Sequence, residues 1–273
     1  MPLFCGGLMQ LIRVFPRRTK ATPDDPFAVV GRPPGFFDEA DEVHVSVTFT
    51  WDLPAAERLE KQWRHVAPTK IGGPATGMRG EEFTPGRYLR PGYVVTSRGC
   101  PNRCWFCSVP KREGALRELP VTEGWNVLDD NVLACGRDHL DAVFEMLGRQ
   151  REAVQFTGGL EAARFEAWHA ERIAALHTKQ VFFAYDTPDD LYRLERAAAL
   201  MFERWSPRGK RVRAYVLGGY QGDTLAAWEA RLREVLALGV VPMAMLYRDE
   251  AGKTAPEWRQ LQRQWARPAM VHV

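Results

Sequence analysis

From about residue 93 onward, short apolar segments alternate with longer amphipathic ones. The short segments are rich in β-branched and aromatic residues, as buried strands are, and the longer ones carry apolar residues at helical spacing. Leu140, Val143, Phe144 and Leu147, for example, fall at the i, i+3, i+4, i+7 positions of one helical face. The strands predicted in this way are 93–97, 126–129, 154–157, 181–185, 212–217 and 241–246.

This alternation predicts an α/β fold with a parallel sheet, because parallel neighbours need crossover connections that helices usually provide. Two architectures satisfy the pattern, a partial (β/α)6 TIM-like barrel and a doubly wound sheet. In both, functional groups gather at the carboxyl ends of the strands. One crossover departs from the pattern, since residues 108–124 contain Pro110 and Pro120 and show no clear helical period. The first helix of the sheet is therefore expected to be short or missing.

Local signals predict where two of the helices begin. The segment 187–190, Thr-Pro-Asp-Asp, offers a capping hydroxyl, a proline for the first turn and acidic side chains for the helix N-terminus. Asp223 is expected to cap a second helix that ends near Gly239.

The N-terminal third of the chain has a different pattern. Residues 16–42 are rich in proline, glycine and charge, and they are expected to be an irregular lead-in. An alternating strand follows at 43–49, then a helix at about 54–66, and the segment 71–74 closes a strand–helix–strand unit. We therefore expect two domains: residues 1–90 with a lead-in and a truncated, Rossmann-like βαβ extension, and residues 91–273 with the larger core.

Composition narrows the class of protein. Hydrophobic residues make up 45% of the 273 residues and charged residues 26%, which is ordinary for a folded globular chain. A net charge of +3 does not by itself indicate a nucleic-acid partner. No apolar stretch is long enough to span a bilayer, and the start of the chain lacks the order of a secretion signal. The sequence thus predicts a soluble, cytoplasmic protein without a membrane partner.

Three of the five cysteines lie within eight residues, in Ser97-Arg98-Gly99-Cys100-Pro101-Asn102-Arg103-Cys104-Trp105-Phe106-Cys107. This C-x3-C-x2-C spacing directly follows a predicted strand, so a flexible loop at the carboxyl edge of the sheet carries three thiols. Closely spaced thiolates can wrap around an iron–sulfur cluster and leave one iron without a protein ligand. The alternative is a structural zinc site, but zinc prefers four ligands in paired knuckles, and no fourth ligand is evident nearby.

The motif resembles that of the radical S-adenosylmethionine (SAM) superfamily, in the branch that contains methylthiotransferases and cobalamin-associated enzymes. The resemblance implies that Cys100, Cys104 and Cys107 bind three irons of a [4Fe–4S] cluster and that SAM chelates the fourth. It also implies a partial barrel of the radical SAM type and reductive cleavage of SAM by a reductant such as flavodoxin or ferredoxin. The resulting 5′-deoxyadenosyl radical would abstract a hydrogen atom from a substrate, which can be a nucleic acid, a peptide or a small molecule.

Two further segments are similar to SAM-contacting motifs of this superfamily. Residues 156–161 resemble its Gly-Gly-Glu motif, although Leu160 interrupts the motif and argues against a role for Glu161. Residues 215–224 resemble its fifth-strand segment, and the strand at 241–246 falls where the family contacts adenine; core packing is the alternative for its methionines and is favoured for at least one of them. The cofactor contacts implied by the resemblance are Phe106, Thr157, Gly158, Gly159, Gly218, Gly219 and Met245.

Polar residues that follow the predicted strands are candidates for gripping the substrate, because parallel strands deliver them to one rim. Asp129, Asp186 and Arg248 are the catalytic candidates, with Asp130, Asn131 and Tyr247 beside them. The structural alternative is that Asp186 supports the neighbouring helix start and that Arg248 pairs with Asp249.

Two features expected of some members of this branch are missing from the sequence, and one rival interpretation stays open. The N-terminal extension is similar to the tail of a cobalamin-binding domain, but the family's Asp-x-His-x-x-Gly motif is absent, so cobalamin binding is not expected. No second cysteine cluster accompanies the first, which weakens a methylthiotransferase interpretation. The rival is a non-catalytic, zinc-stabilised binding module, with the basic run 204–213 as its nucleic-acid contact, although such runs are commonly solvated loops.

Overall fold

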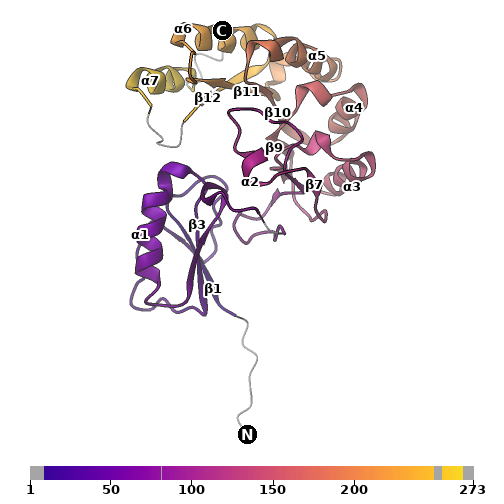
Figure 1. The fold of residues 1–273 in the computed structure, drawn as a ribbon. Coiled ribbons are helices and arrows are strands. Elements are labelled where there is room, and N and C mark those ends of the chain that lie inside the picture. Colours follow the sequence, from indigo (N-terminus) through magenta and orange to yellow (C-terminus); the bar gives the residue numbers. More distant parts are fainter. Residues whose placement is uncertain (1–8, 81, 249–253, 267–273) are drawn as a thin grey trace. The chain divides into compact units, whose positions relative to one another are not determined.

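The computed structural model describes residues 9–80, 82–248 and 254–266, and the chain forms two compact units, Met1–Pro91 and Gly92–Val273 (Figure 1). We describe each unit by itself. Within the described residues, no helix combines the length and the apolar character needed to cross a membrane.

Unit 1 is built on a four-stranded parallel sheet in the order β2-β1-β3-β4. One face of the sheet packs against α1, and Val43, Val45 and Trp63 are completely buried between the two layers. The strand–helix–strand prediction for 43–74 is confirmed in its order as β3, α1 and β4. The first strand and the helix each begin one residue earlier and end three residues earlier than expected, and the last strand begins and ends two residues earlier. The elements of this unit are β1 (Leu11–Phe15), β2 (Ala28–Val30), β3 (Glu42–Ser46), η1 (Thr50–Asp52), α1 (Leu53–Trp63), β4 (Thr69–Gly72) and η2 (Pro74–Thr76).

The second face of this sheet is covered by residues 84–90, which we call the cover segment. Arg13 in β1 is only 7% exposed, and its guanidinium donates to the carbonyl oxygens of Gly86 at 3.1 Å and Arg87 at 2.8 Å. The His44 Nδ1 atom shares a hydrogen bond with the Tyr88 hydroxyl.

The expectation of an irregular lead-in at 16–42 is wrong at β2, which forms a strand within that range, and the strand β1 before it was not expected. A short strand with a buried arginine at its centre has no apolar periodicity that would identify it.

Unit 2 contains a six-stranded parallel sheet in which every strand pairs with the next along the chain, in the order β12-β11-β10-β9-β8-β5. The strand order has no reversal, unlike that of a doubly wound sheet. All six predicted strands are present, as β5 (Tyr93–Val94), β8 (Asn126–Val127), β9 (Val154–Leu160), β10 (Thr178–Tyr185), β11 (Val212–Gly218) and β12 (Val241–Leu246). A separate antiparallel pair, β6 (Ser97–Arg98) with β7 (Arg117–Glu118), brackets the cysteine loop.

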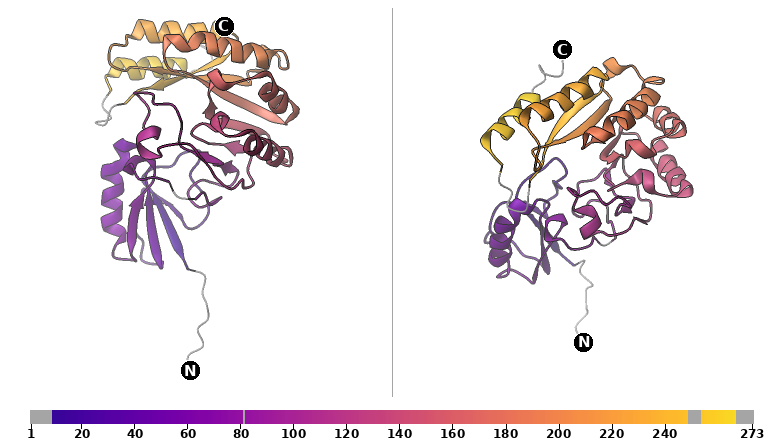
Figure 2. Two further views of the ribbon diagram at one scale, coloured as in Figure 1. Left: turned by 45° about the vertical axis from the view of Figure 1, so that its right-hand side comes forward. Right: turned by 45° about the horizontal axis from the view of Figure 1, so that its top comes forward.

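Helices cover the outer face of the six-stranded sheet (Figures 1 and 2). The apolar stripe expected in α3 is confirmed, because Leu140, Val143, Phe144 and Leu147 are all buried. The first crossover holds only the four-residue α2, as the lack of helical period predicted. The helices are α2 (Val109–Arg112), α3 (Arg137–Gly148), α4 (Ala167–Ala175), α5 (Leu191–Phe202), α6 (Leu225–Ala237) and α7 (Pro256–Trp265), with η3 (Val132–Ala134), η4 (Ala162–Arg164), η5 (Pro188–Asp190) and η6 (Pro207–Gly209).

The two expected helix starts fare differently. Thr187 and Asp190 form a capping box around η5, directly before α5, so that prediction is confirmed. Asp223 does not cap α6, because the Thr224 hydroxyl accepts the Ala227 amide at 3.1 Å instead. Asp223 is nearly inaccessible and forms a 2.8 Å ion pair with Arg231, which gives its carboxylate a stronger partner than a helix terminus.

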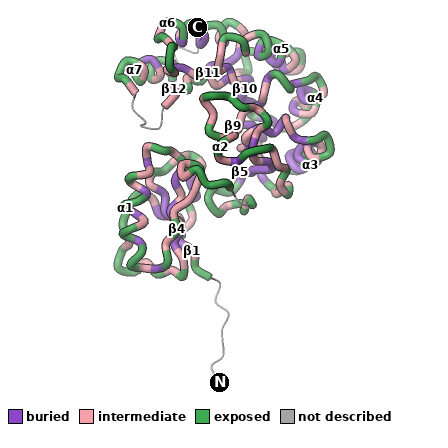
Figure 3. Tube along the Cα trace, in the orientation of Figure 1, coloured by how far each residue is buried: buried purple, intermediate pink, exposed green. Residues whose placement is uncertain are grey.

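On the inner face of this sheet, opposite the helices, β11 and β12 carry residues that are only partly buried; Figure 3 colours the chain by burial. Along β11, buried and half-buried positions alternate strictly, with Val212, Ala214 and Val216 toward the helices. Met243 and Met245 in β12 lie on the inner face and are 44% and 40% exposed. Parallel sheets are usually buried on both faces, so this open inner face is the feature of the fold that suits ligand binding.

Candidate functional site

The three clustered cysteines lie on the loop between β6 and α2, at the carboxyl edge of the unit 2 sheet. We call residues 99–108 the cysteine loop. Cys104 is exposed, while Cys100 and Cys107 are partly buried. A turn joins the last two cysteines, because the Cys107 amide donates to the Cys104 carbonyl at 3.1 Å. The loop therefore presents its thiols near the surface, where a cluster and a substrate can reach them.

Asp129, which follows β8, supports the start of this loop. Its carboxylate is 2% exposed and accepts hydrogen bonds from the Thr96 amide at 2.7 Å and from the Thr96 and Ser97 hydroxyls at 2.6 and 2.7 Å. Burial raises the pKa of Asp129 to about 6, although these hydrogen bonds oppose the shift. The expectation that Asp129 grips the substrate is thus corrected, since a buried carboxylate with three donors positions the chain and has no surface left for a ligand.

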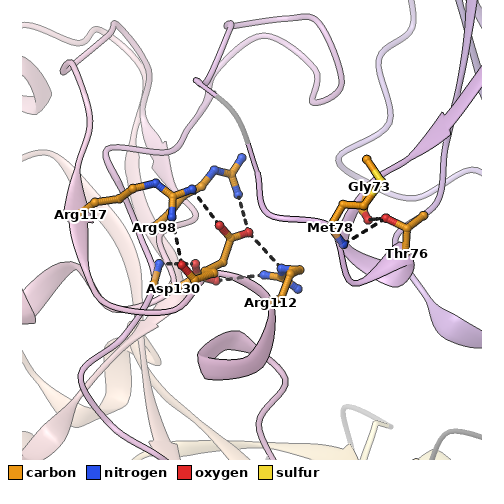
Figure 4. Close-up of polar contacts among 9 residues, drawn as sticks. Gly73, Thr76, Met78, Arg98, Arg112, Arg117 and Asp130 are labelled. Carbon is orange, nitrogen blue, oxygen red and sulfur yellow. Dashed lines mark hydrogen bonds and ion pairs between the residues drawn. The ribbon is translucent and has the colours of Figure 1, made fainter.

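An ionic cluster closes the base of the cysteine loop. The Glu113 side chain is 1% exposed, and Arg112 and Arg117 pair with it at 3.0 and 2.9 Å, with Arg98 at 3.8 Å. Asp130 accepts the Gly99 amide at 2.9 Å and lies 3.4 Å from Arg112. Figure 4 shows Arg98, Arg112, Arg117 and Asp130 converging at this place. Residues before and after the cysteines are thereby joined, which fixes the two ends of the loop.

Gly99 is required where the loop begins. It has φ +83°, and a Cβ atom there would lie 2.4 Å from the Ala115 carbonyl oxygen. Only glycine satisfies both the backbone conformation and this close approach. The residue before Cys100 is thus determined by the geometry of the loop rather than by its chemistry.

Asn131 links the loop to the end of β9. Its Nδ2 atom lies 3.3 Å from the Cys100 Sγ atom and 2.7 Å from Oε2 of Glu161. Glu161 in turn accepts from Arg164 Nε at 2.8 Å. The sequence argued against a role for Glu161 because Leu160 interrupts the motif. In the structure Leu160 is buried under the helices, and Glu161 bonds to Asn131, which itself contacts Cys100 of the cysteine loop.

Asp186, at the carboxyl end of β10, lies within electrostatic range of the thiols. Burial, followed by the charge of Asp190, raises its pKa to about 7. Its structural alternative is not supported, because the Thr187 amide and hydroxyl bond to Asp190 rather than to Asp186. Among the described residues no hydrogen bond to the Asp186 carboxylate is found, so this group is available for proton transfer or substrate binding.

The thiols themselves are influenced by one another. Burial raises the pKa of Cys104 and of Cys107, and the charges of Cys100 and Asp186 contribute in the same direction to both. Within residues 9–80, 82–248 and 254–266, no three His, Cys, Asp or Glu side chains converge as the ligands of one metal ion do. A multi-iron cluster does not require this convergence, because each thiolate binds a different iron.

The remaining cysteines have other settings. Cys135 is buried, and burial raises its pKa to about 11, as expected of a structural thiol. Cys5, for which a structural role was also expected, lies outside the described residues.

Aromatic side chains surround the exposed side of the loop. Trp105 is 58% exposed and contacts Phe106, Tyr220 and Tyr247 at ring distances of 5.3, 5.4 and 5.8 Å. Tyr220 follows β11 and Tyr247 follows β12, so the loop reaches the far end of the sheet. Trp105 and Tyr220 were not predicted as site residues; Trp105 lies inside the motif, and its exposure is a signal that only the structure reveals.

Most of the glycines expected to make room for a ligand make room for other parts of the chain instead. A Cβ atom on Gly158 would lie 2.3 Å from the Asp129 carbonyl oxygen, and one on Gly218 would lie 2.2 Å from the Trp228 ring. Gly219 has φ +81° and approaches Leu246, whereas Gly159 has φ +95° with open space around it. The space left by Gly158, Gly218 and Gly219 is therefore filled by the chain itself, and only Gly159 faces an unoccupied region. Gly158→Val, a substitution suited to blocking a ligand, would displace Asp129.

The other expected contacts lie on the inner face or at its rim. The Thr157 hydroxyl donates to Asn126 Oδ1 at 2.6 Å, and the Tyr215 hydroxyl donates to the Thr157 carbonyl at 2.9 Å. The expectation that at least one of the methionines packs in the core is wrong, because Met243 and Met245 are 44% and 40% exposed. Arg248 follows β12 at the rim, and its expected partner Asp249 lies outside the described residues.

All six strands of the parallel sheet thus contribute to one site around the cysteine loop. It combines three thiols, an acid with a pKa near neutrality, a polar and aromatic rim, and an open sheet face beneath. These features suit a thiolate-bound metal cluster next to a substrate surface. In comparisons with known proteins, no protein-family model matches the chain and no curated protein matches it significantly.

Proposed function

We propose that this protein is a radical SAM enzyme. Unit 2 would be its catalytic core, an incomplete (β/α)6 barrel whose cysteine loop binds a [4Fe–4S] cluster through Cys100, Cys104 and Cys107. One observation carries the proposal: three thiols on one anchored loop stand at the carboxyl edge of a sequentially ordered parallel sheet with an open inner face. The sequential strand order supports the barrel, because right-handed crossovers then place every helix on the same face.

The donor set suits an iron–sulfur cluster. Cysteine thiolates are the usual ligands of such clusters, and a hydrogen bond to a ligand sulfur is one of the means by which proteins adjust them. Cys100 already accepts such a bond from Asn131. When bound, the cluster and SAM would together supply a 5′-deoxyadenosyl radical that abstracts hydrogen from the substrate.

The chain's own residues would do the rest. Asp129, Asp130 and Glu113 hold the cysteine loop in place, while Asp186 can hold or release a proton near neutral pH beside the thiols. The aromatic group around Trp105 would exclude water from one side of the loop. Thr157, Met245 and Arg248 stay candidates for contacts with SAM or the substrate.

Anaerobic reconstitution with ferrous iron and sulfide tests the proposal. The wild-type protein should turn brown, bind iron and sulfide in the ratio of one four-iron cluster, and form 5′-deoxyadenosine from SAM after reduction with dithionite. Cys100→Ala, Cys104→Ala and Cys107→Ala should each lose the cluster and the product, because each thiolate is one of three ligands.

Cys135→Ala is the matched control and should keep both, since Cys135 is buried outside the cysteine loop, where it contacts Ser97. Cys5→Ala is expected to behave in the same way. If all of the single variants behave alike, the ligand assignment is wrong. A colourless wild-type protein that retains zinc instead would support a metal-stabilised binding module and end the radical SAM proposal.

A further inference from the structure

Asn131 makes an unusual contact for a buried amide. The residue is 4% exposed, and its Nδ2 atom lies 3.3 Å from the Sγ atom of Cys100. An amide N–H at this distance can donate a weak hydrogen bond to sulfur, and the bond strengthens when the sulfur is an ionised thiolate. Asn131 begins η3, but its side chain makes no capping hydrogen bond there. Local helix capping therefore does not explain the residue.

Glu161 determines which end of the amide faces the sulfur. Its Oε2 atom lies 2.7 Å from the same Nδ2 atom of Asn131, and an ionised carboxylate only accepts hydrogen bonds. Rotating the amide by a half turn would place the Asn131 oxygen against both the carboxylate and the thiol sulfur. Arg164 holds the same Glu161 oxygen at 2.8 Å, which fixes the carboxylate. The two N–H groups of Asn131 are thus assigned to Cys100 and Glu161.

The other atom of the amide shows that this arrangement has a cost. Asn131 Oδ1 is buried and, among the described residues, has no hydrogen-bond partner. A buried carbonyl oxygen without a hydrogen-bond partner is unfavourable, because it has lost its hydration and gained nothing in return. An apolar side chain of similar size would avoid that cost, so the N–H groups are the part of Asn131 that the site uses.

We propose that Asn131 is a positioning residue that raises the reduction potential of the cluster through its N–H bond to Cys100, and that Glu161 orients it for this purpose. The inference rests on the proposed function. Reduction by one electron makes the cluster and its thiolates more negative, and a hydrogen-bond donor at a ligand sulfur stabilises the more negative state. Without the donor, the cluster should be harder to reduce.

The test uses the reconstituted full-length protein without SAM. Dithionite supplies the electron, and the reduced fraction is followed by electron paramagnetic resonance at set potentials. Asn131→Leu removes both N–H groups at similar volume and should lower the reduction equilibrium constant about tenfold, which is about 59 mV for a one-electron couple. Iron and sulfide content should match the wild type, because all three thiols remain.

Glu161→Gln gives a second measurement that leaves Asn131 in place. Glutamine offers both a donor and an acceptor, so the Asn131 amide can rotate, which lowers the potential, whereas loss of the carboxylate charge raises it; the net shift should therefore be less negative than that of Asn131→Leu. Gln180→Leu is the matched control. It removes an amide that pairs with Gln155 at 2.6 Å on the same sheet, and it should leave the potential unchanged.

The outcomes separate the two proposals. A wild-type protein that assembles no iron–sulfur cluster overturns the proposed function and this inference with it. A normal cluster whose potential is the same in wild type and Asn131→Leu overturns this inference alone. If Asn131→Leu fails to assemble a cluster, the smaller variant Asn131→Ala, which also lacks both N–H groups, decides: a fall in its potential supports the inference, and no change overturns it.

Discussion

The chain contains two parallel sheets that treat their second faces differently. In unit 1, α1 covers one face and the cover segment covers the other, so β1 is buried along almost its whole length. In unit 2, helices cover one face of the sheet and leave Met243, Met245 and a set of amides on the other partly open. The strand sequences differ accordingly, since β1 is buried at successive positions and β11 alternates.

The difference teaches that a sheet covered on both faces can offer a ligand only the ends of its strands, while a sheet with an open face offers that face as well. The carboxyl edges agree with this division. The edge of the unit 2 sheet carries the cysteine loop and acidic residues from several strands. Four experiments can break or sharpen the comparison.

The faces covered by helices should contribute equally to the stability of the two units. Trp63 in α1 and Trp228 in α6 are both completely buried, and Trp228 also donates to the Val216 carbonyl at 3.1 Å. Trp63→Ala and Trp228→Ala should each lower the free energy of unfolding by about 3–5 kcal/mol because of the cavity they leave. Chemical denaturation measures both. A cost below about 1 kcal/mol in either unit would show that its helix layer is not a close-packed core.

The carboxyl edges should differ in pH dependence. Asp52 in unit 1 is paired with Arg17, whereas Asp129 in unit 2 is held only by neutral donors and its pKa rises from 3.8 to about 6. The folded state therefore binds this proton more tightly than the unfolded state. The stabilisation is complete below pH 4 and is lost as the pH rises through 6.

That loss amounts to about 3 kcal/mol at 1.36 kcal/mol per pKa unit. Asp129→Asn cannot titrate, so the gap between its free energy of unfolding and that of the wild type should change by this amount between pH 4 and 7. Urea titrations across that range measure it, and parallel pH profiles for the two proteins would contradict the assignment.

Replacing an arginine on the face opposite the helices should destabilise unit 1 more than unit 2. Arg13 in unit 1 donates to two carbonyl groups of the cover segment, while Arg213 in unit 2 lies over the Phe182 ring at 5.7 Å on the half-open face. Arg13→Met should lower the free energy of unfolding by about 2 kcal/mol and speed hydrogen exchange in residues 84–90. Arg213→Met should lower the free energy of unfolding by less than about 1 kcal/mol. Equal losses in the free energy of unfolding would mean that both sheets are packed to the same extent on the face opposite their helices.

The smallest effect is expected at the open face itself. Met245→Gln replaces a 40% exposed apolar side chain, so the free energy of unfolding should change by no more than about 0.5 kcal/mol. Thermal unfolding with Val216→Gln as the control measures this, because Val216 is completely buried on the opposite face of the sheet. A large loss in Met245→Gln would show that the inner face is packed rather than available to a ligand.

Much of unit 2 could be predicted because its local signals agree with its tertiary structure. The strands alternate, the α3 stripe faces the core, and the Thr187 capping signal begins a helix as expected. In unit 1 the signals were weaker. β1 has a buried Arg13 at its centre and β2 has only three residues, so neither shows a period that could be recognised.

The candidate site was predictable in its chemistry and much less in its details. The cysteine spacing and the order of strand ends indicated which residues share the rim. Asp129, however, is enclosed by Thr96 and Ser97, and Gly158 makes room for Asp129 rather than for a ligand. Such roles depend on residues about 30 positions away along the chain, and no local pattern records them.

The sequence by itself determined the α/β class, the run of six strands, the cysteine loop and its place after the first of them, because each follows from local periodicity and spacing. The tertiary structure alone decided which acids are buried and which are accessible, that Asn131 contacts both Cys100 and Glu161, and that one sheet face stays open. The physical reason is that burial, electrostatic environment and hydrogen-bond partners are set by segments brought together from distant parts of the chain, whereas secondary structure is encoded largely within each segment.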